Sequence, residues 1–189
     1  MKPVFILSPP RCRTSWLSAY LTGAGVFCFH EAWKQVADAH ALRRLMESKG
    51  PGTVVNADCA NWLFLDEIER EFPEARYVEI HRHGDLEQAW ATAFGEMDWS
   101  LLMARYQCAR QAQHGPLLMS IDFHRWTPEI SLQLWDRMTD GTPMDMDWHA
   151  QCHGWRIEPT RDQVSRDAEA GRTGPHRDRV MKGASAWDG

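Results

Sequence analysis

The stretch Val4–Leu17, VFILSPPRCRTSWL, joins two different hydrophobic patterns. A short apolar run predicts a buried strand over residues 3–8, and the two prolines that follow end it. From residue 14 onward the apolar residues recur at helical spacing, which predicts a helix over residues 14–24. Two arginines, a threonine and a serine therefore lie at the junction of a strand and a helix.

Such a junction suits an anion. The first backbone N–H groups of a helix have no intrahelical partner and the helix dipole is positive there, while Thr14 and Ser15 add hydroxyl donors and Arg11 adds charge. We therefore expect a phosphorylated ligand. The stretch lacks the glycines and the lysine of a Walker A loop, which disfavours ATP hydrolysis. The alternative is that the hydroxyl residues only cap the helix and the arginines are solvated.

Strand and helix patterns alternate along most of the chain. This alternation predicts a three-layer α/β fold, with a four- or five-stranded, mainly parallel sheet flanked by helices, whose ligands bind at the carboxyl ends of the strands. Further strands are predicted over residues 26–29, 53–57, 76–81 and 117–121, and helices over residues 31–48, 61–71, 85–95, 98–112 and 128–138. After residue 143 the periodicity fades.

Length and composition favour one domain. The 189 residues are 43% apolar, enough for one core, which we assign to residues 1–158. Residues 159–189 are rich in Arg, Asp, Gly, Ala and Ser, and we expect a polar tail that is mobile or ordered by a ligand.

Charge and cysteine usage exclude several classes of protein. A net charge of −5 argues against nucleic-acid binding by the whole surface. The chain has no leader pattern and no apolar stretch of about 18 residues, so we expect a soluble protein without a membrane segment. Five widely spaced cysteines form neither a disulfide framework nor a zinc motif, which fits a cytoplasmic setting. Nothing in the sequence indicates the oligomeric state.

The segment Pro10–Trp16, PRCRTSW, resembles the first turn of the sulfotransferases, roughly P-[KR]-S-G-T-[ST]-W. Cys12 stands in place of the serine and Arg13 in place of the glycine, and short bacterial and phage sulfotransferase-like proteins look similar in carrying an arginine there. The resemblance implies a P-loop-like fold. It also implies that the turn binds the 5′-phosphosulfate of 3′-phosphoadenosine-5′-phosphosulfate (PAPS) through Arg11, Cys12, Arg13, Thr14, Ser15 and Trp16.

A second segment, Tyr77–Asp85, resembles the family's strand followed by R-[DN]-P. Arg82 takes the position of the arginine that binds the cofactor's 3′-phosphate, and a bidentate guanidinium suits a phosphate dianion. The family's serine position falls on Trp90, so that contact is missing or comes from Thr92 or another group. The alternative is that Arg82 pairs with Asp85 on the surface.

A third segment, Phe27–Trp33, lies where several sulfotransferases place a catalytic glutamate. This resemblance, which spans about residues 3–125, implies that Glu31 takes the proton of an acceptor hydroxyl, with His30 as the competing general base. The alternative is that Glu31 only complements the dipole of a helix start. Asp58 ends a strand at the same edge, where it orients Arg11 or the acceptor, or caps a helix.

These segments together predict a sulfotransferase that acts on a small-molecule or carbohydrate acceptor without a metal. One alternative is a nucleotide or nucleoside kinase-like P-loop enzyme, which would need Mg²⁺. Another is a degenerate nucleotide-binding or interaction module, suggested by Arg13, Trp90 and Met181. Two weaker signals are the spacing of His149, Cys152 and His153, which could ligate a metal, and Lys182-Gly183, which faintly resembles the family's R-K-G segment.

Overall fold

The computed structural model describes residues 1–84, 86–87, 89–90, 100–111 and 115–154. The helix expected over residues 85–95 lies mostly outside these residues. Thr92 and the tail over residues 159–189, with Met181 and Lys182, lie outside them entirely.

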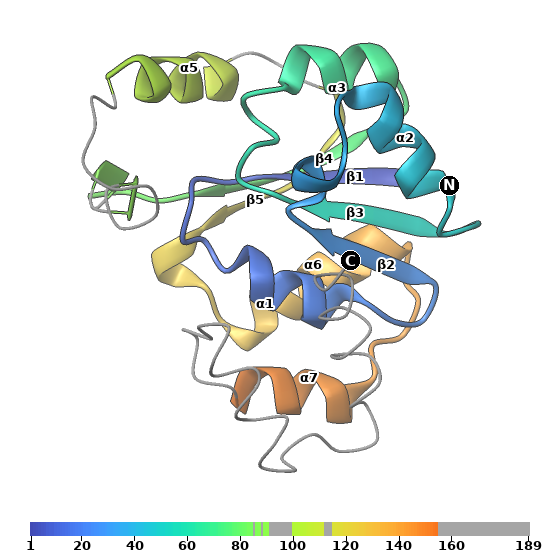
Figure 1. Cartoon of the computed structure of the whole chain (residues 1–189). Coiled ribbons are helices and arrows are strands. Elements are labelled where there is room, and N and C mark those ends of the chain that lie inside the picture. Colours follow the sequence, from blue (N-terminus) through green and yellow to red (C-terminus); the bar gives the residue numbers. More distant parts are fainter. Residues whose placement is uncertain (85, 88, 91–99, 112–114, 155–189) are drawn as a thin grey trace.

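The centre of the molecule is a five-stranded sheet in which every pairing is parallel. Its order, β2-β3-β1-β4-β5, places the first strand in the middle (Figure 1). The predicted α/β fold with a four- or five-stranded, mainly parallel sheet is thus confirmed, with five strands. The strands are β1 (Lys2–Leu7), β2 (Val26–His30), β3 (Thr53–Ala57), β4 (Arg76–His81) and β5 (Leu117–Asp122).

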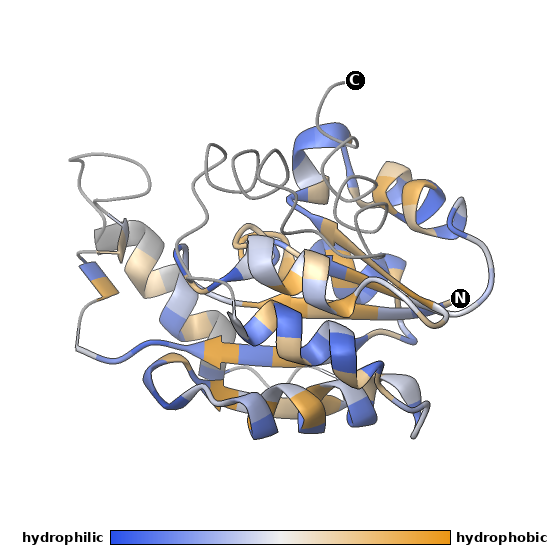
Figure 2. Ribbon diagram, turned by 90° about the horizontal axis from the view of Figure 1, so that it is seen from below, coloured by the Kyte–Doolittle hydropathy of each residue, from blue (hydrophilic) through white to orange (hydrophobic). Residues whose placement is uncertain are grey.

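Helices cover both faces of the sheet (Figure 1). Side chains alternate along a strand, so Val4 and Ile6 of β1 join one core, with α1 (Thr14–Leu21), α6 (Pro128–Thr139) and α7 (Met146–Gly154). Phe5 joins the other, with α2 (Ala39–Glu47) and α3 (Leu65–Glu71). Apolar colour follows the strands between polar outer helix surfaces (Figure 2). A smaller cluster includes Tyr106 of α5 (Ser100–Gln111).

The continuous helix predicted over residues 31–48 is wrong. The structure has a single 3₁₀ turn, η1 (Ala32–Gln35), and then a separate α2. Val36 is extended, and the Asp38 side chain caps α2 by accepting a hydrogen bond from the Ala41 N–H at 2.7 Å. An aspartate that caps a helix starts one, so it interrupts an otherwise helical apolar spacing. The next helix begins at Leu65 rather than at residue 61.

A helix that the fading periodicity did not predict, α7, packs against α1. Asp145 starts it by accepting hydrogen bonds from the N–H groups of two following residues. The Trp16 indole donates to the Cys152 carbonyl at 2.9 Å, and the Trp148 indole donates to the Tyr20 carbonyl at 3.1 Å. The first helix is therefore held in place by the last described one.

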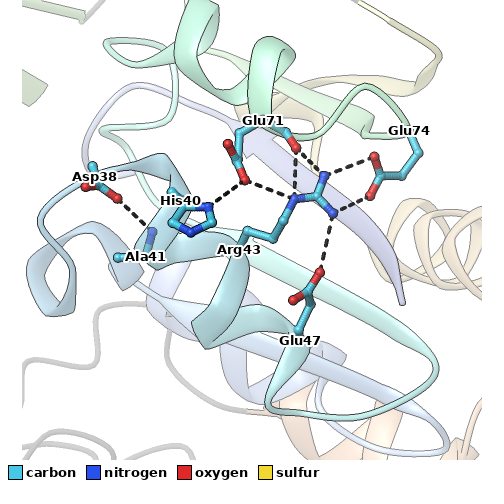
Figure 3. A network of polar contacts seen from close by, with 7 residues as sticks. All are labelled: Asp38, His40, Ala41, Arg43, Glu47, Glu71 and Glu74. Atoms are coloured by element: carbon cyan, nitrogen blue, oxygen red, sulfur yellow. Dashed lines mark hydrogen bonds and ion pairs between the residues drawn. The ribbon is translucent and has the colours of Figure 1, made fainter.

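On the opposite face, Arg43 joins α2 to α3 in a network that we call the α2–α3 lock (Figure 3). Its guanidinium donates to the Glu71 carbonyl and lies at ion-pair distance from the carboxylates of Glu47, Glu71 and Glu74. The guanidinium also lies 4.5 Å from the centroid of the Phe72 ring. The positive charge of Arg43 is thus paired with carboxylates of the fold itself.

The strand order gives the sheet a switch point between β1 and β4. The chain leaves β1 toward the β2 edge of the sheet and leaves β4 toward the β5 edge, while β1 and β4 are neighbours. The two following loops diverge at such a switch point, and ligands of open parallel sheets bind there. These loops carry Arg11 and Arg13 on one side and Arg82 on the other.

No helix in the described part of the chain is long and apolar enough to cross a membrane. All five cysteines lie within the described residues and are free thiols.

Candidate functional site

The turn between β1 and α1, residues 8–13, has an unusual backbone; we call it the arginine turn. Arg11 and Arg13 both have φ of 62°, in the left-handed region that favours glycine. Each such residue costs roughly 1–2 kcal/mol. Arg13 is the N-cap of α1 and stands where the sulfotransferase pattern has glycine, so it adopts a backbone conformation that glycine would adopt freely.

Strain of this kind clusters at one edge of the molecule. Of the five non-glycine residues with positive φ in the described part of the chain, three are predicted site residues: Arg11, Arg13 and Glu31, the last with φ of 53°. Backbone strain persists only where the surrounding structure enforces it, and it is concentrated at ligand sites. The three strained site residues lie at the carboxyl edge of the sheet.

The turn also buries polar groups without satisfying them. Ser8 is fully buried, and its hydroxyl has no hydrogen-bond partner among the described residues. Burying an unpaired hydroxyl carries a desolvation cost of about 1–3 kcal/mol. Cys12 is also fully buried. The first turn of α1 contains no acidic residue that would compete with an anion for its N–H groups.

The structure brings the predicted arginines together. Arg82 donates from Nη1 to the Arg11 carbonyl at 2.9 Å, so a side chain from the end of β4 bridges to the arginine turn. The guanidinium of Arg13 is directed toward the Phe123 and Trp126 rings, at 5.3 and 5.9 Å from their centroids. Burial lowers the pKa of Arg13 below that of a free arginine.

His30 lies against the start of α1. Its Nε2 is 3.1 Å from the Thr14 hydroxyl and 3.0 Å from the Ser15 hydroxyl. Burial lowers the pKa of His30 to about 4, which keeps the imidazole neutral at pH 7. A neutral ring accepts or donates one hydrogen bond at Nε2 according to its tautomer, so His30 orients the two hydroxyls.

Glu31 follows at the end of β2 and is the N-cap of η1. Its carboxylate forms an ion pair with Lys34 and is 23% exposed, so a ligand at this edge could reach it. Asp58, by contrast, is almost fully buried and accepts hydrogen bonds from the N–H groups of Trp33 and Ala60. Burial raises the pKa of Asp58. Asp58 does not cap the following helix, because the N-cap of α3 is Phe64.

Two buried asparagines that the sequence analysis did not single out support this edge. The Asn61 amide donates to the carbonyls of Ile6 and Asn56, each at 2.9 Å. Its oxygen accepts from the Asn56 amide at 2.8 Å and from the Trp33 indole at 2.9 Å. This network ties the ends of β1 and β3 to η1, and hence to Glu31. A polar residue inside the otherwise apolar strand TVVNA was the available signal for Asn56.

Other predicted residues lie elsewhere. Trp16 is 2% exposed and stacks on Tyr20 within the core, and Trp90 is buried beside Trp62. No three His, Cys, Asp or Glu residues of the described ranges are placed to hold a metal ion. His149 of the suggested metal motif instead lies 3.0 Å from the Tyr20 hydroxyl.

Comparisons with models of known protein families and with curated proteins found no match for this chain.

Proposed function

We propose that this protein is a sulfotransferase with a P-loop-like fold, which transfers a sulfuryl group from PAPS to a hydroxyl or amine of a small-molecule or carbohydrate acceptor. The observation that carries the proposal is the convergence of Arg11, Arg13 and Arg82 beside the N-terminus of α1, at the switch point of the sheet. Cationic side chains beside free helix N–H groups form a site for phosphate or sulfate groups.

The cofactor has charged groups on both sides of its ribose, which suits two sources of positive charge. The arginine turn, with Thr14 and Ser15, binds the 5′-phosphosulfate. Arg82, from the neighbouring strand, binds the 3′-phosphate. The bond between Arg82 and the Arg11 carbonyl fixes the spacing of the two groups before the cofactor arrives.

In the reaction the acceptor oxygen or nitrogen attacks sulfur in line with the leaving phosphate. The S–O bond to the cofactor breaks, and adenosine 3′,5′-bisphosphate leaves. Charge develops on the equatorial and leaving oxygens, where helix N–H groups, the two hydroxyls and Arg11 stabilise it. No metal takes part.

Glu31 acts as the general base that accepts the acceptor's proton. His30 is less suited to this role, because a buried imidazole of pKa about 4 is a weak base and its Nε2 already bonds to Thr14 and Ser15. His30 instead orients the hydroxyls that face the phosphosulfate.

Isothermal titration calorimetry with adenosine 3′,5′-bisphosphate and with ATP, each with and without Mg²⁺, tests the proposal. We expect the bisphosphate to bind more tightly than ATP and independently of metal. Arg43→Ala should bind like the wild type, because Arg43 lies in the α2–α3 lock. Tighter, Mg²⁺-dependent binding of ATP would overturn the proposal in favour of a kinase. Bisphosphate binding without sulfuryl transfer to any screened acceptor would favour a binding module.

A further inference from the structure

One aromatic ring contacts two cations of the candidate site. Phe123 is the first residue of the 3₁₀ turn η2 (Phe123–Arg125), directly after β5. The Arg82 guanidinium lies 4.4 Å from the centroid of this ring, and the Arg13 guanidinium lies 5.3 Å from it. Nothing in the sequence marked Phe123 as more than an apolar residue at the end of a strand.

The position of the ring is fixed from two directions. The side chain is partly buried and packs against the core formed by α1, α6 and α7. The turn that carries it is held by Asp122, whose carboxylate accepts a hydrogen bond from the His124 N–H at 3.0 Å. Phe123 therefore presents a rigid surface at the carboxyl edge of the sheet, where Arg13 and Arg82 arrive from two other segments.

Two guanidinium groups held near one another repel, and their long side chains would otherwise move apart into solvent. The negative face of an aromatic ring attracts a cation and is most effective where water is partly excluded. Arg13 is half-buried, its Nε has no hydrogen-bond partner among the described residues, and it also lies 5.9 Å from the Trp126 ring. These aromatic contacts therefore stabilise the positive charge of Arg13, which no carboxylate of the described residues neutralises.

We propose that Phe123 is a positioning residue that holds Arg13 and Arg82 ready for the anionic groups of one ligand. This inference rests on the proposed function for the identity of that ligand, adenosine 3′,5′-bisphosphate and its sulfated form. The positioning role itself needs only that the arginine cluster binds phosphate groups. Phe123 acts through the guanidiniums and makes no contact with the reacting atoms.

Phe123→Leu, which keeps an apolar side chain but removes the ring face, tests the role by calorimetry with two probes, adenosine 3′,5′-bisphosphate and inorganic pyrophosphate. We expect about three- to tenfold weaker binding of both probes, the range of a cation–π contact. Phe123→Trp, which restores a ring face, should recover most of the affinity. The matched control is Phe27→Leu, since Phe27 makes a similar contact with Lys49, at 4.6 Å, on another part of the molecule.

A structural role is separated from a positioning role by removing the two arginines. In an Arg13→Ala/Arg82→Ala background, Phe123→Leu should change probe affinity no further, whereas damage to the fold would still lower it. Thermal melting of each variant confirms that it is folded.

The outcomes distinguish the inference from the proposed function. Unchanged affinity in Phe123→Leu, with normal bisphosphate binding by the wild type, would overturn the inference alone. Pyrophosphate binding that depends on Phe123, without bisphosphate binding, would overturn the proposed function alone. A wild-type protein that binds neither probe would overturn both.

Discussion

Arginine plays different parts in the α2–α3 lock and at the arginine turn. In the α2–α3 lock, Arg43 is met by three carboxylates and a carbonyl. At the arginine turn, Arg11 and Arg13 have no carboxylate at ion-pair distance within the described residues, and both have strained backbones. The lock uses its charge to join two helices. The turn leaves Arg11 and Arg13 without a carboxylate partner among the described residues, and its strained backbone costs stability.

The largest expected difference between the two regions is in the rate of sulfuryl transfer. Glu31→Gln keeps the side chain's shape but removes its basicity, so we expect the rate of sulfuryl transfer to fall by roughly 10²–10⁴ with little change in bisphosphate affinity. Single-turnover rates measure this, after an acceptor has been identified by screening with radiolabelled PAPS. Glu71→Gln, in the lock, is the control and should leave the rate unchanged. A normal rate in Glu31→Gln with an inactive His30→Ala would move the base to His30.

The second effect is on stability as a function of pH. The pKa of His30 is lowered to about 4 in the folded protein, from about 6.5 when unfolded. The unfolded chain then binds more protons between these values, so the free energy of unfolding falls as the pH decreases through this window. The loss from His30 is on the order of 3 kcal/mol.

Urea unfolding near pH 7 and near pH 4 measures this loss, and His30→Gln should reduce it. Some dependence will remain in the variant, because burial also lowers the pKa of His149 and His153. A variant with the same pH dependence as the wild type would contradict the buried, neutral state of His30.

Third, Arg82→Ala should lower ligand affinity, whereas Arg43→Ala should lower stability. Arg82→Ala should weaken adenosine 3′,5′-bisphosphate by about 10- to 100-fold, the value of a charge-assisted hydrogen bond, and should affect adenosine 5′-phosphosulfate far less. Arg43→Ala should lose about 1–2 kcal/mol of stability and keep its affinity. Calorimetry and urea unfolding of both variants measure these quantities. Equal losses of the two nucleotides in Arg82→Ala would place Arg82 away from the 3′-phosphate.

The smallest effect tests the strain at the arginine turn. Arg13→Gly relieves the left-handed backbone, but it also loses the aromatic contacts and makes the unfolded chain more flexible. Its stability should therefore stay within about 1 kcal/mol of the wild type, while bisphosphate affinity falls about tenfold. Urea unfolding and calorimetry measure the two quantities. A large loss of stability with unchanged affinity would make Arg13 a structural residue, like Arg43.

Local patterns predicted the regular parts of this fold. The apolar run before Pro9 and the Thr127-Pro128 start of α6 lie where the sequence placed them, because strand period and helix capping are encoded by neighbouring residues. The helix over residues 31–48 was wrong because its apolar spacing continued across a break. Asp38, an ordinary N-cap residue, was the signal that could have located that break.

The sequence indicated candidate site residues segment by segment, but it did not indicate how these segments contact one another. The arginine turn could be described from its own residues, since its chemistry lies in a strand-to-helix junction. The convergence of Phe123 with Arg13 and Arg82, or of Asn61 with the end of β1, depends on strand order. Pairings between distant segments leave no periodic trace in a single sequence, and an isolated phenylalanine resembles any other core residue.

The packing of α7 on α1 bears on how the protein is made. Trp16 is bonded to a carbonyl 136 positions later in the chain, and Tyr20 is bonded to the side chain of residue 149. Long-range contacts of this kind form late, since a long loop must close before they can stabilise anything. During synthesis, α1 would leave the ribosome well before α7 and would wait for most of the described chain before it is fixed. The nascent chain would complete its candidate anion site at the end of folding.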